Sequence, residues 1–516
     1  MISYDAVVAG AGLGGLSAAL RLTLQGKKTL LLEQRSLPGG AASSFRRGRF
    51  EFDPCLRGLT DIGTDNDPGA LAKLLSEYGV KLPFCTADGA FRLISRREDG
   101  TPLDLVLPAG IGDFIDLCEA LEPGSAPKME AFFRLLEEVN RGCRALEAAG
   151  GAMTQEMLQE IYPALVSTGA YTVTEVFHAL KLPQGCRELL SAWWSDLCVP
   201  VDRLSFPQYA SYVYRILRRG VSLPVQGSSA LSTALADRFR KLGGTLRLGE
   251  EVTGLLFDGD KLTGVRTALN DYAAEQVFLD IHPDRVCGRL LPWDRVPQEE
   301  KQLSAARGGD YAGCFFTLCL GLDRDARELG IRDHRIIISP STDPTAVYDA
   351  LMEDSVSAGF LDFTCAALVD PEAAPKGGCV CALRTLTSPA QWEGLSQEEY
   401  QTRKNGLSLK LLQLLADKAG IHLLGHIEEL TAMTPLSYAR ILGTPQGAGY
   451  GCPPQDWDGY MARLRSSFPE SGIPGLHYVG ASAALGGGMT EVMLGGSVAA
   501  KLAQNRSFSG RKEERR

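Results

Sequence analysis

The stretch YDAVVAGAGLGGLSAALRLTLQGKKTLLLE, residues 4–33, decides the fold of the N-terminal region. Residues 4–9 form a short apolar run, which is typical of a buried parallel strand. A glycine-rich turn follows, and then leucines and alanines recur at helical spacing until Gly26 ends the segment. Residues 28–32 predict a second strand that ends on Glu33. The predicted order is therefore strand, loop, helix, strand and acid.

The glycines of this turn have separate physical roles. Gly10 permits a tight turn out of the strand, Gly12 lets the backbone approach a pyrophosphate, and Gly15 lets the helix pack close to the sheet. The helix N-terminus offers N–H groups and a partial positive charge to phosphates. Glu33 stands where a carboxylate accepts ribose hydroxyls. The complete unit predicts a dinucleotide site, and the alternative is a glycine-rich turn in an unrelated α/β domain.

A second loop follows directly on Glu33. Residues 35–44 read RSLPGGAASS, and the doublet Gly39-Gly40 supplies another stretch of backbone that can lie against a cofactor. The chain then runs into the alternating strand RFEFD, residues 49–53, where an NAD domain would usually continue with another strand–helix unit. This arrangement resembles the flavoprotein superfamily that includes amine oxidases and carotenoid desaturases.

A third glycine-rich loop lies near the C-terminus. Residues 476–480, LHYVG, predict a short buried strand, and the loop ASAALGGGMT follows at 481–490. Residues 491–503, EVMLGGSVAAKLA, then predict a helix of small residues. A glycine loop that feeds a helix N-terminus binds anions or oxygens, and three consecutive glycines leave room for a flat ring. The alternative is a tight packing turn.

The two ends together resemble the phytoene desaturase, carotenoid isomerase and retinol saturase family, and the likeness covers nearly the whole chain. Further motifs appear in the family's order. They are VQG at 225–227 with GGTLRLGEEV at 243–252, DPEAAPKG at 370–377, and TP at 434–435 with GTPQGAGYG at 443–451. No single motif is decisive, but their shared order is specific.

The resemblance implies an α/β fold, in which a FAD-binding Rossmann-like domain of the amine oxidase and carotenoid desaturase type carries an inserted α+β substrate domain. We expect the FAD-binding domain at 1–70, 220–290 and 450–516, and the substrate domain at 71–219 and 291–449. FAD is the expected cofactor. Its expected binding residues are Gly10, Gly12, Gly14, Gly15, Glu33, Gln34, Arg35, Gly39, Gly40, Ala41, Val252, Gly480, Ala481, Gly487, Gly488 and Met489.

The resemblance also implies redox chemistry or isomerisation at C=C or C–C bonds of a hydrophobic polyene or isoprenoid-like substrate. The flavin ring would do the hard chemistry, which fits the lack of a Ser-His-Asp or paired-carboxylate motif. Arg57 is the one charged side chain that we would test near the ring, and the alternative for it is a salt-bridged surface residue. Catalytic residues are otherwise not predicted.

Two other functions compete with this one. The first is a flavin amine or amino-acid oxidase, against which Ala41 counts because amine oxidases have arginine at the corresponding place. The second is a non-catalytic carrier of flavin or isoprenoid, which turnover of bound flavin would distinguish. Ala481 also departs from the family pattern, because many flavoproteins place an acid there for the ribityl chain.

A set of aromatic residues offers walls for an elongated apolar tunnel, although ordinary core is at least as good an interpretation for each one. The set comprises Trp193, Trp194, Phe206, Tyr209, Tyr212 and Tyr214.

Composition excludes some partners. The net charge of −9 and the pI of about 5.4 argue against nucleic-acid binding, which needs a basic face. The basic tail at 506–516 reads as a frayed terminus. No signal peptide or spanning run is expected, so the predicted location is cytoplasmic, with peripheral membrane contact left open. The oligomeric state is not predicted.

No metal is predicted. His422 and His426 have metal-like spacing, but Gly425 and a strand-like run around them argue against a helix-borne site. The 13 cysteines read as small buried residues of a reducing compartment. In Cys379-Val-Cys381 the alternation of a strand puts both sulfurs on one face.

Overall fold

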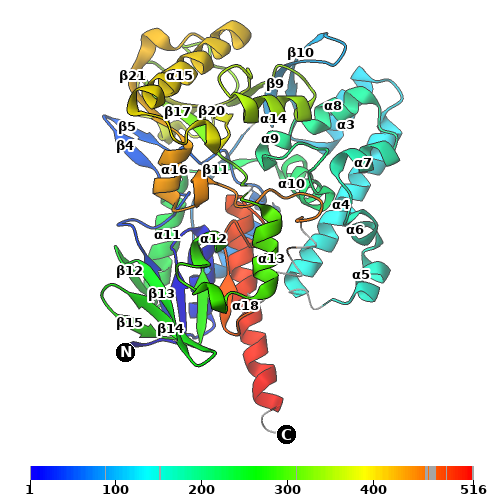
Figure 1. Cartoon of the computed structure of the whole chain (residues 1–516). Coiled ribbons are helices and arrows are strands. Elements are labelled where there is room, and N and C mark those ends of the chain that lie inside the picture. Colours follow the sequence, from blue (N-terminus) through cyan, green and yellow to red (C-terminus); the bar gives the residue numbers. More distant parts are fainter. Residues whose placement is uncertain are drawn as a thin grey trace.

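The computed structural model describes residues 2–87, 89–149, 153–309, 311–459, 463, 472–483 and 485–513. Two large sheets organise these residues. In Figure 1 the N-terminal sheet and its neighbours lie in the lower half, and the second sheet lies in the upper half.

The lower half is built on a parallel sheet of five strands in the order β12-β3-β2-β16-β22. These strands span Thr245–Leu248, Thr29–Glu33, Ala6–Ala9, Gln276–Leu279 and Leu476–Tyr478. Strands β2 and β3 follow one another in the chain and pair in the sheet, whereas their outer neighbours come from distant segments, the last of them from the C-terminal region. The predicted α/β fold with a Rossmann-type sheet is confirmed.

Period-two alternation assigns the two faces of this sheet. Ala6, Val8 and Leu31 pack against helices on one face, and Val7 and Leu30 pack against a smaller sheet on the other. The helices are α1 (Leu13–Leu24), α2 (Ala70–Tyr78), α11 (Gly227–Lys241) and α18 (Met489–Glu513). The smaller sheet has the order β1-β15-β14-β13, with strands at Ile2–Ser3, Asp271–Ala273, Lys261–Thr267 and Val252–Asp258.

The upper half is built on a mixed sheet of seven strands in the order β10-β9-β18-β19-β20-β17-β21. The strands span Pro102–Leu107, Phe91–Arg96, Arg335–Ile338, Leu361–Cys365, Cys379–Leu386, Phe315–Leu322 and Ile427–Met433. Apolar residues of one face, such as Phe316, Ile336 and Leu383, pack against α15 (Gln397–Ala419). The other face points toward the lower half.

A group of helices flanks the seven-stranded sheet (Figure 1). They are α3 (Ile111–Leu121), α4 (Ala126–Ala149), α5 (Gln155–Ile161), α6 (Pro163–Thr168), α7 (Val173–Ala179), α8 (Gln184–Ser191), α9 (Trp194–Leu197), α10 (Phe206–Arg219) and α14 (Pro344–Glu353). Elsewhere the chain forms α12 (Pro283–Val286), α13 (Gln298–Arg307) and α16 (Pro435–Leu442), and 3₁₀ turns at Trp293–Arg295, Ala366–Leu368, Pro371–Ala373, Pro389–Gln391, Leu424–His426 and Pro445–Gly447. Three two-stranded pairs complete the fold: β4 (Phe45–Arg47) with β5 (Phe50–Phe52), β6 (Gly63–Thr64) with β7 (Asp67–Pro68), and β8 (Phe84–Thr86) with β11 (Ser222–Pro224).

Asp53 links the strand predicted at 49–53 to the helix after residue 226. Its Oδ2 accepts hydrogen bonds from the Ser228 N–H, at 2.7 Å, and from the Ser228 hydroxyl, at 2.5 Å. The carboxylate therefore satisfies an amide in the first turn of α11, which has no cap from its own N-cap residue, Gln226.

The C-terminal helix is longer than the sequence predicted. Helix α18 begins at Met489 and continues to Glu513, so it includes most of the tail that was expected to fray. Residues 514–516 and the side chains of the tail lie outside the described residues. Near its start, α18 packs against α1, since a Cβ on Gly496 would lie 2.2 Å from the Gly14 carbonyl oxygen.

Candidate active site

A cavity of about 800 Å³ runs from the carboxyl ends of the parallel strands to the inner face of the seven-stranded sheet. Ligands of open α/β sheets bind at that edge of the sheet. Every predicted cofactor residue except Gly15 lines the cavity, and so does Arg57. The lining cofactor residues are Gly10, Gly12, Gly14, Glu33, Gln34, Arg35, Gly39, Gly40, Ala41, Val252, Gly480, Ala481, Gly487, Gly488 and Met489.

The first two loops lie directly on one another. The Gly39 N–H donates to the Ala11 carbonyl over 2.7 Å, and a Cβ on Gly40 would lie 3.2 Å from the Gly12 Cα. The Glu33 carboxylate joins them, because it accepts from the Ala11 N–H at 2.8 Å and from the Arg35 N–H at 2.9 Å. Glu33 therefore stands at the end of β3 with its carboxylate beside the glycine turn.

Gly15 lies outside the cavity because it is a packing contact. A Cβ at this position would lie 2.0 Å from the Gly10 carbonyl oxygen. This is the close approach of helix to strand that the sequence assigned to the third glycine.

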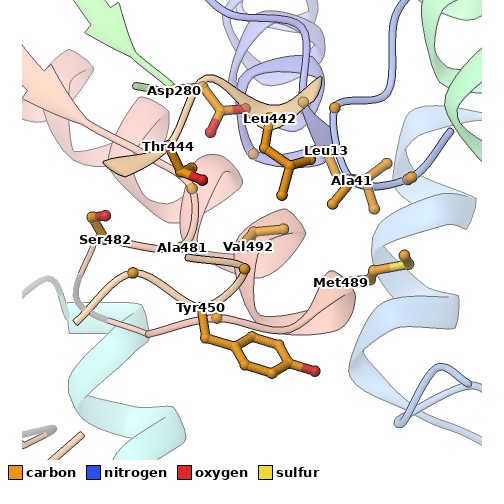
Figure 2. A pocket seen from close by; sticks show the side chains of 18 of the residues that line it. Leu13, Ala41, Asp280, Leu442, Thr444, Tyr450, Ala481, Ser482, Met489 and Val492 are labelled. Carbon is orange, nitrogen blue, oxygen red and sulfur yellow. The ribbon is translucent and has the colours of Figure 1, made fainter. Parts of the chain in front are cut away.

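Asp280 is a cavity residue that the sequence analysis missed. It follows β16, and its Oδ2 accepts from the Gly15 N–H over 2.9 Å. A Cβ on Gly12 would lie only 2.4 Å from the same oxygen, so this carboxyl fills the space that Gly12 leaves open. Burial and, to a lesser extent, the charge of Glu33 raise the pKa of Asp280 to about 6, and the hydrogen bond from Gly15 opposes this rise. Figure 2 shows Asp280 at the cavity wall near Leu13 and Leu442.

A signal for Asp280 existed in the sequence. QVFLD, residues 276–280, is a short apolar run that ends on an acid, as the run before Glu33 does. Both acids therefore stand at the carboxyl ends of parallel strands.

The C-terminal glycine loop closes the cavity from the opposite chain end. A Cβ on Gly14 would lie 2.7 Å from the Gly480 nitrogen, so the first and last glycine loops touch. A Cβ on Gly487 would lie 2.4 Å from the Tyr450 ring. Met489, Ala481 and Tyr450 surround the open space in Figure 2.

Arg57 lies at the far end of the cavity, in a buried network of charges. Its Nη1 lies 3.0 Å from Asp196 Oδ1 and 3.2 Å from Asp362 Oδ2, and its Nη2 donates to the Tyr450 hydroxyl. Arg335 pairs with the same two acids at 2.6 and 2.9 Å. The salt-bridge alternative for Arg57 is correct, but its surface location is wrong, because the side chain is only 9% exposed.

These ion pairs keep the network charged. Burial alone would lower the pKa of Arg57, but Tyr450, Asp196 and Asp362 raise it well above its usual value. Burial alone would raise the pKa of Asp362, yet the nearby arginines bring it to about 2. Arginine and carboxylate therefore stay ionised at neutral pH.

The predicted aromatic tunnel is mostly wrong. Of the six residues, only Tyr212 lines the cavity, and Trp193, Trp194, Phe206, Tyr209 and Tyr214 belong to the hydrophobic core beside the seven-stranded sheet. A helical or strand pattern shows which residues are buried together, but it does not distinguish a core from a ligand cavity.

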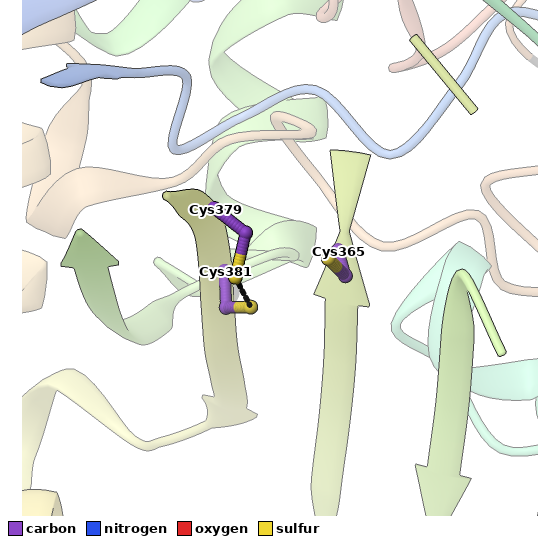
Figure 3. Close-up of side chains that lie close together, drawn as sticks. All are labelled: Cys365, Cys379 and Cys381. Carbon is purple, nitrogen blue, oxygen red and sulfur yellow. Dashed lines mark hydrogen bonds between the residues drawn. The ribbon is translucent and has the colours of Figure 1, made fainter. Parts of the chain in front are cut away.

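Three cysteines meet on the sheet face that α15 covers, away from the cavity. Cys379 and Cys381 share one face of β20 as predicted, with 4.0 Å between their sulfurs, and Cys365 is the strand neighbour of Cys381 (Figure 3). The three sulfurs lie within 4.8 Å of one another, so this group could hold a metal ion. The prediction of no metal rested on histidines and did not consider it. His426 contacts Asp323 instead, with 3.0 Å between Nδ1 and Oδ1, and it ends a 3₁₀ turn rather than lying in a strand-like run.

Among the helices of the described residues, none is long and apolar enough to cross a membrane.

Fold and cavity together define a Rossmann-based protein with a site for a nucleotide cofactor. Residues 8–77 match the family model of the NAD(P)-binding Rossmann-like domain. This match covers the end of β2, the glycine turn, Glu33 and the second loop.

Curated relatives cover most of the chain. A prolycopene isomerase of Daucus carota is 23% identical over 96% of this chain and 79% of its own length. A lycopene-forming phytoene desaturase of Pseudescherichia vulneris is 24% identical over 96% of this chain and 98% of its own length. An all-trans-retinol 13,14-reductase of Danio rerio is 25% identical over 68% of this chain and 58% of its own length. The predicted resemblance to the phytoene desaturase, carotenoid isomerase and retinol saturase family is confirmed, and the chain is an oxidoreductase.

Solved structures share the fold at lower identity. An oxidoreductase from Methanosarcina mazei aligns with a TM-score of 0.62 and 15% identity, over 97% of this chain and 100% of its own. A putrescine oxidase bound to putrescine aligns with a TM-score of 0.60 and 14% identity, over 98% of this chain and 99% of its own.

Proposed function

We propose that the protein is a FAD-dependent oxidoreductase that acts on C=C or C–C bonds of a hydrophobic polyene or isoprenoid-like substrate. The observation that carries the proposal is the cavity, which joins three glycine loops from the two ends of the chain to the space beside the inner face of the seven-stranded sheet. The curated relatives, whose names specify carotenoids and retinol, support the substrate class.

The residues at the lower end of the cavity fit a dinucleotide. Gly12 is the N-cap of α1 and has no side chain over the helix N-terminus, which leaves that end of the helix open to an anion. Glu33 is placed for the ribose hydroxyls, and Val252 lies on β13 at the adenine end that the family resemblance implies. The Asp280 carboxyl, which accepts from the Gly15 N–H in the first turn of α1, would repel a diphosphate when ionised.

The C-terminal glycine loop fits a flat ring system. Gly487 and Gly488 leave backbone exposed to the cavity, and Ala41 and Met489 also line it (Figure 2). A bound flavin would supply hydride and single-electron chemistry there. The chain's own residues would hold the ring between the two chain ends and exclude water from its face.

The reacting part of the substrate would lie between this loop and the inner face of the seven-stranded sheet. Tyr212, Phe315 and Leu485 form apolar wall there. Desaturation, saturation and cis–trans isomerisation all fall under the proposal, because each needs a C=C or C–C unit held against the ring. A substrate of this class partitions into lipid, so we place the reaction in the cytoplasm with access to a membrane surface.

We also propose that the cofactor domain comprises residues 1–70, 220–290 and 450–516, and the substrate domain residues 71–219 and 291–449. The distribution of the two large sheets between these ranges supports the division.

The test is anaerobic incubation of the purified yellow protein with a panel of polyenes and a panel of amines, followed by flavin absorbance. We expect polyenes to change the flavin spectrum or to be converted, and amines to leave it unchanged. Reduction by amines alone would support an amine oxidase. Bound FAD that no substrate reduces or reoxidises would indicate a carrier, and a colourless protein that takes up no FAD would refute the proposal.

A further inference from the structure

The inner face of the seven-stranded sheet is charged, although the sheet is buried. Along β20, Cys379, Cys381 and Leu383 point to α15, so the alternate residue Arg384 points to the cavity side. On β19 the strand neighbour of Arg384 is Asp362, which points the same way. A buried strand face that carries an arginine needs an explanation, because burying a charge is costly unless the charge is paired.

Arg384 differs from its two arginine neighbours in its partners. Arg57 and Arg335 each pair with both Asp196 and Asp362. Arg384 is 4% exposed, its Nη2 donates to the Pro54 carbonyl at 2.6 Å, and its buried Nε has no hydrogen-bond partner. Among the described residues no carboxylate lies within ion-pair distance of Arg384. Its charge helps to lower the pKa of Asp362, but Arg57 and Arg335 already share that acid.

The other ionisable groups near Arg384 do not add a compensating negative charge. Three guanidinium groups face two carboxylates in this network, which leaves one positive charge. Asp53 directly follows nearby β5, but its Oδ2 accepts hydrogen bonds from Ser228. Burial raises the pKa of Asp53, and burial also raises the pKa of the Cys55 thiol to about 12. Asp53 and Cys55 therefore favour the neutral state, unlike Asp362.

Arg384 and Arg57 converge on the cavity. Their guanidinium carbons lie 5.1 and 5.6 Å from the centre of the Phe315 ring, and all three residues line the space. Tyr450 accepts a hydrogen bond from Arg57, so its hydroxyl hydrogen is left to donate. This end of the cavity therefore offers a cation, hydrogen-bond donors and an aromatic wall together.

We propose that Arg384, supported by Arg57 and Tyr450, binds a carboxylate of the substrate, which is therefore an amphiphile with an apolar unsaturated chain and one acidic end. The single surplus charge matches a monoanion, whereas a diphosphate would leave buried negative charge in excess. This inference rests on the proposed function for the reaction and adds the substrate's polar end.

The test compares ligands that differ only in charge. Full-length protein with its bound FAD is titrated with all-trans-retinoic acid and with its methyl ester, and binding is followed by flavin absorbance and tryptophan fluorescence. We expect the acid to bind at least tenfold more tightly than the ester at neutral pH. Equal binding of acid and ester would overturn the inference while the bound flavin still supports the proposed function.

Three variants test whether Arg384 causes the preference for the acid over the ester. Arg384→Gln should abolish the preference for the acid, and Arg384→Lys should keep part of it because it keeps the charge. Arg49→Gln, which removes an exposed arginine paired with Glu428, is the control and should retain the preference in full. An Arg384→Gln protein that still prefers the acid would refute the assignment, and the wild-type comparison decides the question if this variant does not fold.

A third ligand separates carboxylate from phosphate. Geranylgeranyl diphosphate should bind more weakly than the acid. Tighter binding of the diphosphate than of the acid would refute the proposal that the substrate carries a single carboxylate. A variant that changes the reduction of the flavin but not the ligand preference would show that Arg384 serves the ring instead, and would equally overturn the inference.

Discussion

Gly15 provides the sharpest test of how the cofactor loop is built. A Cβ added here would lie 2.0 Å from the Gly10 carbonyl oxygen and 3.2 Å from the Asp280 Cβ. Both obstacles are backbone or the root of a side chain, so neither can rotate away. In Gly15→Ala, helix α1 must move from β2 or the glycine turn must change its path.

The size of the effect follows from the surroundings of α1. An ordinary carbon–oxygen contact is about 3.2 Å or longer, so the new methyl group is too close by roughly 1 Å. Retreat of the helix is blocked because α18 contacts its other side at Gly14 and Gly496. Overpacking of this kind costs about 1–3 kcal/mol, and we expect the upper end. A displaced loop that loses one hydrogen bond to a charged phosphate costs a further ~1.5–3 kcal/mol of binding, or roughly 10- to 100-fold in flavin affinity.

Two measurements on Gly15→Ala check this expectation: flavin per protein from the absorbance ratio, and the free energy of unfolding in urea. The matched control is Gly406→Ala in α15, where a Cβ meets nothing within 4 Å. The control should keep its flavin and gain about 0.5–1 kcal/mol, because alanine is the better helix residue. Wild-type flavin content in Gly15→Ala, with stability within about 0.5 kcal/mol of wild type, would refute the tight loop.

Three further predictions concern carboxylates. Glu33→Gln should lower the affinity for flavin about tenfold, because it weakens the acceptor for the ribose hydroxyls. Equilibrium dialysis against free FAD measures this affinity. An unchanged affinity would show that Glu33 does not bind the cofactor. Because the folded-state pKa of Asp280 is raised to about 6 from 3.8, the ionised group destabilises the fold as the pH rises from about 4 to 6. The free energy of unfolding of flavin-free Asp280→Asn should therefore exceed that of wild type by about 3 kcal/mol at pH 7.5, since one pKa unit corresponds to about 1.4 kcal/mol, and should match it near pH 4. An equal gain at both pH values would contradict the shift. Asp53→Ala should lower the free energy of unfolding by about 1–3 kcal/mol, because it leaves the first turn of α11 without its acceptor. Asp53→Asn keeps an acceptor for Ser228 and should lower it less. Identical losses of the two variants in urea unfolding would show that Asp53 does not cap α11.

The N-terminal unit was predictable because its signals are local. Strand, glycine turn, helix and Glu33 lie within 30 residues, and each has a stereochemical reason that is independent of the rest of the chain. The contact between the first and last glycine loops was also predictable, but only from the order of motifs that the family shares.

The far end of the cavity was not predictable in the same way. Arg384, Asp362 and Asp196 become neighbours only through strand pairing and the position of α9, which periodicity does not specify. Tyr212 and Tyr209 belong to one helix, yet only Tyr212 reaches the cavity. The three cysteines likewise meet because β19 pairs with β20, and the sequence could show only that two of them share a face.

The contact between the first and last glycine loops also determines when the parallel sheet can be completed during protein synthesis. Strand β2 and its glycine turn leave the ribosome long before β22 and α18, which complete the same sheet and cover the same helix more than 460 residues later in the chain. At cellular elongation rates that interval is tens of seconds. During this time Ala6–Ala9 and α1 lack part of their native cover, so the nascent chain must shield apolar surface before any cofactor can be enclosed.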